Sequence, residues 1–146
     1  MLLAMEILLL GKGPSAARIG EYLDGPIAVI NDAMKLFDGP VRYCFFSDIE
    51  LIESCREHWH QVEHFVSPDR LHKNFTLCDV ENPIKERLTT FPYSLSFIDE
   101  DVYRERVKNR QMVHHPTASG AMCWLAYAGY TRIKMLGFDG GVGLVG

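Results

Sequence analysis

The chain has 146 residues, of which 47% are apolar, enough for one sizeable core and too few for two ordinary domains. Its formal net charge of −4 disfavours nucleic-acid binding, because proteins that hold a nucleic-acid backbone usually display a basic face. No apolar run approaches the roughly 20 residues that span a bilayer. The opening MLLAMEILLLG lacks the basic start and the cleavage site of a signal peptide. We therefore expect one cytoplasmic domain over residues 1–146, with no transmembrane segment and with homo-oligomerisation left open.

The first half of the chain alternates apolar runs with helical patterns. The continuous runs are typical of strands covered on both faces of a parallel sheet. These predicted strands are residues 7–10, 27–30 and 43–46. Helical spacing predicts a helix over residues 16–23 with Ser15 as its N-cap, and another over residues 49–59 with Asp48 as its N-cap. A short strand is expected over residues 63–66.

The second half is irregular before it becomes ordered again. Three prolines in residues 67–110 argue against long regular elements there. An apolar helix over residues 118–128 is expected to end at Gly129, and a strand over residues 133–136 runs into GFDGG. This alternation predicts an α/β fold, a three-layer Rossmann-like domain with a mostly parallel sheet.

The cysteines and most of the histidines do not form a metal-binding pattern. The four cysteines make no C-x-x-C pair, so we expect buried, reduced thiols at Cys44, Cys55, Cys78 and Cys123. His58, His60 and His64 have no neighbouring cysteine or acidic residue that completes a zinc site. We therefore expect these histidines on a solvated surface, and we predict no metal site.

Glycine and polar residues follow the ends of several predicted strands and open the last helix. Ligands of parallel α/β sheets bind beyond the carboxyl ends of the strands. The segments expected to meet there are Gly11–Ser15, Asn31–Asp32, Ser47–Asp48, Thr117–Gly120 and Gly137–Gly140.

Two of these segments have a clear physical use. The turn GKGPS allows close backbone approach and leads into a helix start that offers N–H groups to an anion, although it could equally be a tight corner. It is not a Walker loop, because it lacks the final Gly-Lys-Ser/Thr. It is not a dinucleotide fingerprint either, because Ala16 stands where the G-x-G-x-x-G pattern needs its third glycine. Thr117 and Ser119 place hydroxyls at a helix start, where they suit a ribose, phosphate or carboxylate, or serve as an N-cap.

Taken together, LLLGKGPSAARI, VIND and HPTASGAMCWLAYAGYTRIKMLGFDGG resemble the sialyltransferase-like glycosyltransferases. Bacterial family 42 enzymes have a comparable Gly-Asn-Gly-Pro-Ser turn, a second-strand Asn and a late Thr-Ser-Gly helix leading to Gly-x-Asp. Eukaryotic family 29 enzymes are similar at a greater distance. The resemblance touches both ends of the chain and leaves the middle unmatched.

The resemblance implies a GT-A-like variant of the fold that binds CMP-sialic acid or another CMP-linked sugar. It also implies a glycan acceptor, no required metal or other cofactor, and a histidine that deprotonates the acceptor hydroxyl while CMP departs. The nucleotide-binding residues then expected are Gly11, Lys12, Gly13, Ser15, Asn31, Asp48, Thr117, Ser119, Gly120, Gly137 and Asp139.

This chain departs from the family pattern at three places. Lys12 stands where the family has Asn, and glycines at 140–141 stand where the family often has aromatic residues that bind the leaving phosphate. The catalytic histidine of the family lies beyond the position of Gly146. His114 and His115, which precede the Thr-x-Ser-Gly helix, are weak substitutes for it.

Two other interpretations remain open. Archaeal-type pterin pyrophosphokinases resemble the same superfamily and need ATP, Mg²⁺ and acidic strand ends, for which Asp32 and Asp48 are candidates. Alternatively, the chain is a non-catalytic nucleotide-binding module, or a fragment whose missing C-terminal part carries the base and the acceptor site.

Overall fold

A parallel sheet runs through the centre of the domain. The computed structural model describes residues 5–71, 75–91 and 116–139. The strands in these ranges are β1 (Glu6–Leu10), β2 (Ile27–Ile30), β3 (Val41–Phe45), β4 (Val62–Pro68), β5 (Leu88–Phe91) and β6 (Arg132–Leu136). They form one six-stranded sheet in the order β5-β4-β3-β2-β1-β6, and every neighbouring pair is parallel. The domain therefore has an α/β, Rossmann-like fold.

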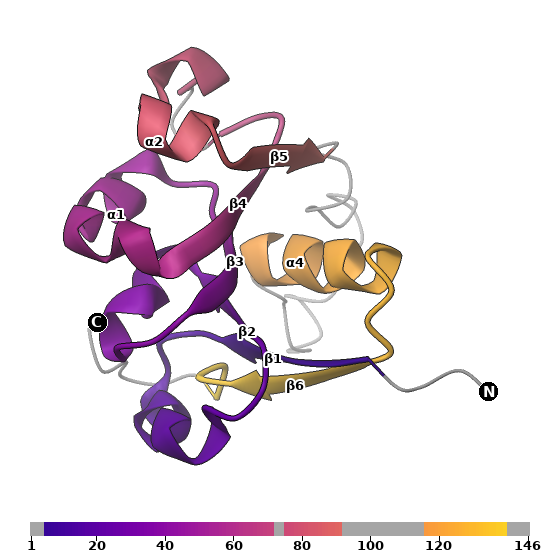
Figure 1. Ribbon diagram of the computed structural model, residues 1–146. Helices are drawn as coiled ribbons and strands as arrows, with labels where there is room; N and C mark the ends of the chain where they lie inside the picture. The colour runs from indigo at the N-terminus through magenta and orange to yellow at the C-terminus, as the bar shows by residue number, and fades with distance from the viewer. Residues whose placement is uncertain (1–4, 72–74, 92–115, 140–146) are drawn as a thin grey trace, which may run out of the picture.

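Short helices and one long helix cover opposite faces of this sheet (Figure 1). One face carries η1 (Pro14–Tyr22), η2 (Asn31–Leu36), α1 (Ile49–Glu53), η3 (Arg56–Gln61), η5 (Leu77–Asp79) and α2 (Asn82–Lys85). The other face carries α4 (Pro116–Tyr127). The predicted three layers are thus present, with the short helices on one side and the long helix on the other. No helix among the described residues is long and apolar enough to cross a membrane.

Burial on both faces explains why the strands read as continuous apolar runs. Along β1, Leu8 and Leu10 pack under the short helices, whereas Ile7 and Leu9 pack under α4. Alternate side chains of a strand point to opposite faces, so a strand between two helical layers needs apolar residues at every position. The three strands predicted from this pattern, and the two others expected over residues 63–66 and 133–136, are confirmed with small shifts of their ends. The pattern missed β5.

The helix predicted over residues 49–59 is wrong as a single element. It forms two pieces, α1 and η3, which are separated at Cys55, whose φ and ψ are −120° and 32°. After the break, the indole N–H of Trp59 donates to the carbonyl of Ile52 at 2.9 Å, and Trp59 is buried. Trp59 therefore remains on the buried side of this segment, in line with Ile52, although the helix is interrupted between them.

Two smaller expectations also need correction. Ser15 does not cap the first helix, because η1 begins at Pro14 with Gly13 as the N-cap. Cys44 and Cys55 are buried as expected, but Cys78 and Cys123 are exposed. All four thiols are free. The expectation of no long regular element within residues 67–110 fits the described part of that range, where η5, α2 and β5 have at most four residues each.

Candidate functional site

The carboxyl edge of the sheet brings the predicted site segments together. Strand order reverses at β1, because the chain passes from β1 through β5 on one side and returns with β6 on the other. Such reversal points are where open α/β sheets bind ligands. The turn after β1 consequently has two neighbours, the turn after β6 on one side and the turn after β2 on the other. These two sides have different chemistry.

On the β6 side, the turns are bonded directly to each other. Ser15 Oγ donates to Asp139 Oδ1 at 2.7 Å and accepts from the backbone N–H of Gly137 at 2.8 Å. The backbone N–H of Gly13 donates to the carbonyl of Gly137 at 2.7 Å. Gly13 and Ser15 of the first turn are therefore bonded to Gly137 and Asp139, which follow the last strand. All four are predicted site residues.

The glycines at this junction are required by its close packing. A Cβ at Gly11 would lie 2.6 Å from the carbonyl oxygen of Gly137, and one at Gly13 would lie 2.9 Å from the same atom. Gly137 has a φ of 83°, which L side chains rarely adopt, and its own Cβ would overlap the carbonyl of Gly11. These glycines thus have a structural role as the corner residues of two touching turns.

Asp139 already places a negative charge at the start of η1. Both of its carboxylate oxygens accept from the backbone N–H of Ser15 at 3.2 Å. Carboxylates are favourable at helix N-termini, and the hydrogen bonds from Ser15 hold the pKa of Asp139 below its ordinary value. A phosphate arriving at this N-terminus would meet a carboxylate, so the β6 side does not favour an anion.

The β2 side carries a buried carboxylate between two lysines. Lys12 Nζ lies 2.8 Å from Asp32 Oδ1, and Lys35 Nζ lies 2.9 Å from Asp32 Oδ2. The Asp32 side chain is 4% exposed and each lysine side chain is 31% exposed. Burial alone would raise the pKa of Asp32, but the ammonium groups of Lys12 and Lys35 beside it lower it below its ordinary value. Lys12 is therefore neither unpaired nor simply directed to solvent.

Asn31 has an unusual backbone and an unpartnered side-chain atom. Its φ is 51°, and no other non-glycine residue among those described has a positive φ. The residue is 6% exposed, and its Oδ1 has no hydrogen-bond partner within the described part of the chain. Buried polar atoms are nearly always paired, and left-handed backbone in a residue other than glycine is a strain that clusters at functional sites. Asn31 is thus the clearest sign of a ligand contact.

The end of β3 meets the start of α4 through a pair of hydroxyls. Ser47 Oγ lies 2.9 Å from Thr117 Oγ1, and Thr117 is buried. Neither Thr117 nor Ser119 is an N-cap, because both lie inside α4 after Pro116. Gly120 is buried on the same helix. The predicted hydroxyl segment therefore reaches the carboxyl edge, where it touches the β3 turn.

The predicted acidic and histidine candidates divide between the edges of the sheet. Asp48 caps α1 by accepting from the backbone N–H of Glu50 at 3.0 Å. His58 and His60 belong to η3, which leads into the amino end of β4, and His64 lies within that strand. In the described ranges no three His, Cys, Asp or Glu residues form a group that could hold a metal ion. Positions 114 and 115 lie outside the described residues.

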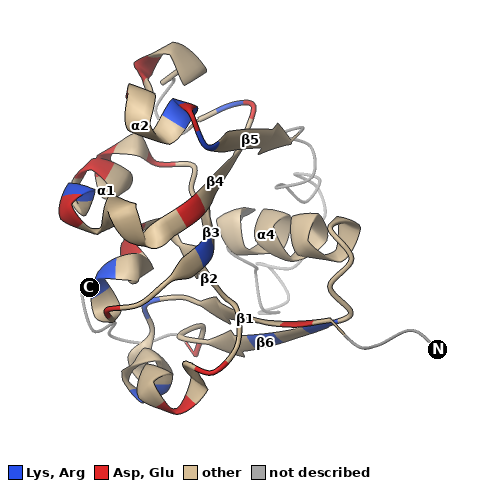
Figure 2. Ribbon diagram, in the orientation of Figure 1, with Lys and Arg blue, Asp and Glu red and all other residues tan. Residues whose placement is uncertain are grey.

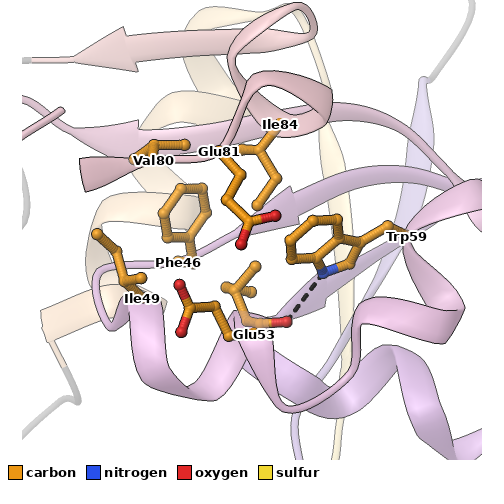
Figure 3. Close-up of a pocket in the computed structure, with 8 residues that line it drawn as sticks. Phe46, Ile49, Glu53, Trp59, Val80, Glu81 and Ile84 are labelled. Atoms are coloured by element: carbon orange, nitrogen blue, oxygen red, sulfur yellow. Dashed lines mark hydrogen bonds between the residues drawn. The ribbon is translucent and has the colours of Figure 1, made fainter. Parts of the chain in front are cut away.

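A small hollow lies within the layer of short helices, and its lining is mostly apolar, unlike the carboxyl edge of the sheet (Figure 3). Aromatic and aliphatic side chains from α1, η3 and α2 form most of it, with Glu53 and Glu81 beside them. Glu81 is paired with Arg56, and the indole of Trp59 is bonded to the backbone of Ile52. The hollow therefore follows from packing between short helices and presents no arrangement of unsatisfied polar groups.

Charge is mixed over the ribbon of the described residues (Figure 2). Positions of Lys and Arg are interspersed with those of Asp and Glu, and no large basic region is seen on the ribbon. Any recognition of an anion must therefore be local. Lys35 is the one member of the local charged group that sequence reasoning missed. Its spacing from Asp32, three residues along a helix, was the available signal.

Comparisons of the chain with protein-family models, with curated proteins and with solved structures find no match.

Proposed function

We propose that this domain binds a cytidine nucleotide sugar at the carboxyl edge of its sheet, as a GT-A-like, sialyltransferase-like glycosyltransferase domain. In this proposal the donor is a CMP-linked sugar and the acceptor is a glycan hydroxyl. The support is the order of the three sequence motifs, together with their arrangement around one edge of a parallel sheet.

Asn31 is the single observation that carries the proposal. An amide oxygen that is buried without a partner, on a strained backbone at a strand end, is costly for folding. A ligand with a hydroxyl or amino donor would remove that cost by pairing with the oxygen. Ribose hydroxyls and the cytosine amino group are donors of this kind. The hydroxyls of Ser47 and Thr117, at the neighbouring strand end, add groups suited to the same type of ligand.

Calorimetric titration with CMP and cytidine tests the proposal. We expect CMP to bind, and we expect Asn31→Gly to lower the affinity by about tenfold, the effect of losing a hydrogen bond with a buried partner. Glycine keeps the positive φ that this position needs, so urea denaturation should show a folded protein. Asn82→Gly, at an exposed position on α2, is the matched control. Absence of CMP and cytidine binding at millimolar concentration would overturn the proposal.

The magnesium-dependent pyrophosphokinase interpretation is less well supported. Asp32, one of its two acidic candidates, has an ammonium group on each carboxylate oxygen, so a magnesium ion would have to displace both lysines. Asp48 is engaged in capping α1. Titration with ATP and MgCl₂ distinguishes the two, because magnesium-dependent binding of ATP without a response to CMP would favour the pyrophosphokinase interpretation.

A further inference from the structure

We propose that Lys12 and Lys35 form a clamp for a phosphate group, held in place by Asp32 and located between the turns after β1 and β2. This inference rests on the proposed function and assigns the phosphate of the nucleotide to a particular side of the first turn. Its ligand class is a phosphate monoester or a pyrophosphate.

The geometry leaves donors available on both lysines. An ammonium group has three N–H donors, and the contact of each lysine with Asp32 needs only one of them. Both lysine side chains are partly exposed at 31%, whereas the carboxylate between them is almost fully buried. The two positive groups can thus face solvent while Asp32 faces the protein.

Asp32 acts as a positioning residue. A flexible lysine loses side-chain entropy when it is fixed on a ligand, and part of that loss is already made when the lysine is held by a buried carboxylate. Because one carboxylate binds both ammonium groups, they lie next to each other, and the group as a whole keeps one positive charge. Preorganised donors of this kind bind anions without further rearrangement.

The β6 side of the first turn disfavours a phosphate, which leaves the β2 side as its location. The start of η1, which would otherwise attract an anion, already has the carboxylate of Asp139 on the backbone N–H of Ser15. Repulsion from Asp139 therefore disfavours a phosphate on the β6 side. On the β2 side a phosphate would meet two cations and would lie close along the chain to Asn31, whose Oδ1 has no hydrogen-bond partner among the described residues.

The test compares the wild type with the triple variant Lys12→Gln/Asp32→Asn/Lys35→Gln. This variant removes the whole charged group, so that no buried carboxylate is left without a partner. Lys85→Gln, on α2, is the control, because it changes the net charge by the same amount at an exposed position. Urea denaturation checks that all three proteins are folded. Affinities for cytidine, CMP and inorganic pyrophosphate are then measured by calorimetry.

We expect the triple variant to lose about tenfold or more in CMP affinity, the range for hydrogen bonds to charged groups, while its cytidine affinity is unchanged. Equal CMP affinity in the triple variant and the wild type would overturn the clamp and leave the proposed function standing. If the wild type binds neither cytidine nor CMP, the proposed function fails. The clamp is then tested by the affinity of the wild type and the triple variant for pyrophosphate. Pyrophosphate binding by the wild type that is lost in the triple variant supports the clamp. If the wild type does not bind pyrophosphate, the clamp is overturned.

Discussion

The two sides of the first turn differ in what they do with charge. Toward β6, the turn is closed by its own chain, because Ser15, Gly137 and Asp139 satisfy one another across the strand ends. Toward β2, Lys12 of the turn and Lys35 of η2 are both partly exposed, and both pair with the buried carboxylate of Asp32. A glycine-rich turn can therefore serve packing on one side and recognition on the other, so its glycines alone do not identify a phosphate site.

The largest expected effect comes from disturbing the closed side at Gly137. We expect Gly137→Ala to lower the free energy of unfolding by about 3 kcal/mol, because alanine is strained at positive φ and its Cβ would overlap the Gly11 carbonyl. Urea denaturation measures this change. Gly20→Ala is the control, since a Cβ there meets nothing within 4 Å. Similar stabilities of the two variants would mean that the turns do not touch as described.

The next effect concerns the charged side. The double variant Lys12→Met/Lys35→Met leaves Asp32 buried without a partner, and we expect it to lower the free energy of unfolding by about 2 kcal/mol, reduced from the value for a fully buried pair because the lysines are partly exposed. The triple variant with Asp32→Asn should recover most of this loss. If the double variant is as stable as the wild type, Asp32 is not held by these lysines.

Acid should weaken the charged side in a defined pH range. The folded-state pKa of Asp32 lies below its ordinary value of 3.8, so its stabilising contribution is fully present above that value and is lost as the pH falls through the lower, folded-state pKa. Denaturant titrations of the wild type and Asp32→Asn between pH 7 and pH 2 measure the contribution. The stability difference between them should shrink only below about pH 4. A difference that disappears at higher pH would contradict the lowered pKa.

The smallest effect is expected from Asp139→Asn. The amide oxygen can still accept from Ser15, so the two turns remain joined. Removing the negative charge should raise the CMP affinity slightly, because the β6 side no longer repels an anion. Calorimetry with CMP measures the change, and a fall in affinity would indicate that Asp139 itself contacts the ligand.

The sequence predicted the elements whose signal is local. Residues 7–10 of β1 and all four residues of β2 are apolar because both faces are covered, and this pattern is visible without a structure. By contrast, β5 was missed because it has four residues, two of which are exposed threonines. The break at Cys55 was missed because the apolar spacing of residues 49–59 continues across it.

Site contacts between distant segments could not be predicted in the same way. Ser15 was expected to cap its own helix, but its partner is Asp139, 124 residues away. The sequence placed Lys12 and Asp32 at the same edge without showing that they pair, and the three-residue spacing of Lys35 from Asp32 is too common a pattern to identify a site. Convergence on an edge follows from topology, whereas the choice of partners depends on side-chain positions that only the folded chain specifies.

Binding of the phosphate on the β2 side of the first turn is tested by the amide chemical shifts of ¹⁵N-labelled protein during a titration with CMP. Lys12, Ala33 and Lys35 report on the β2 side, and Ser15 and Gly137 report on the β6 side. We expect the largest, saturable shifts at the β2 side and smaller shifts at Ser15 and Gly137. Largest shifts at Ser15 and Gly137, with Lys12 and Lys35 unaffected, would contradict this expectation.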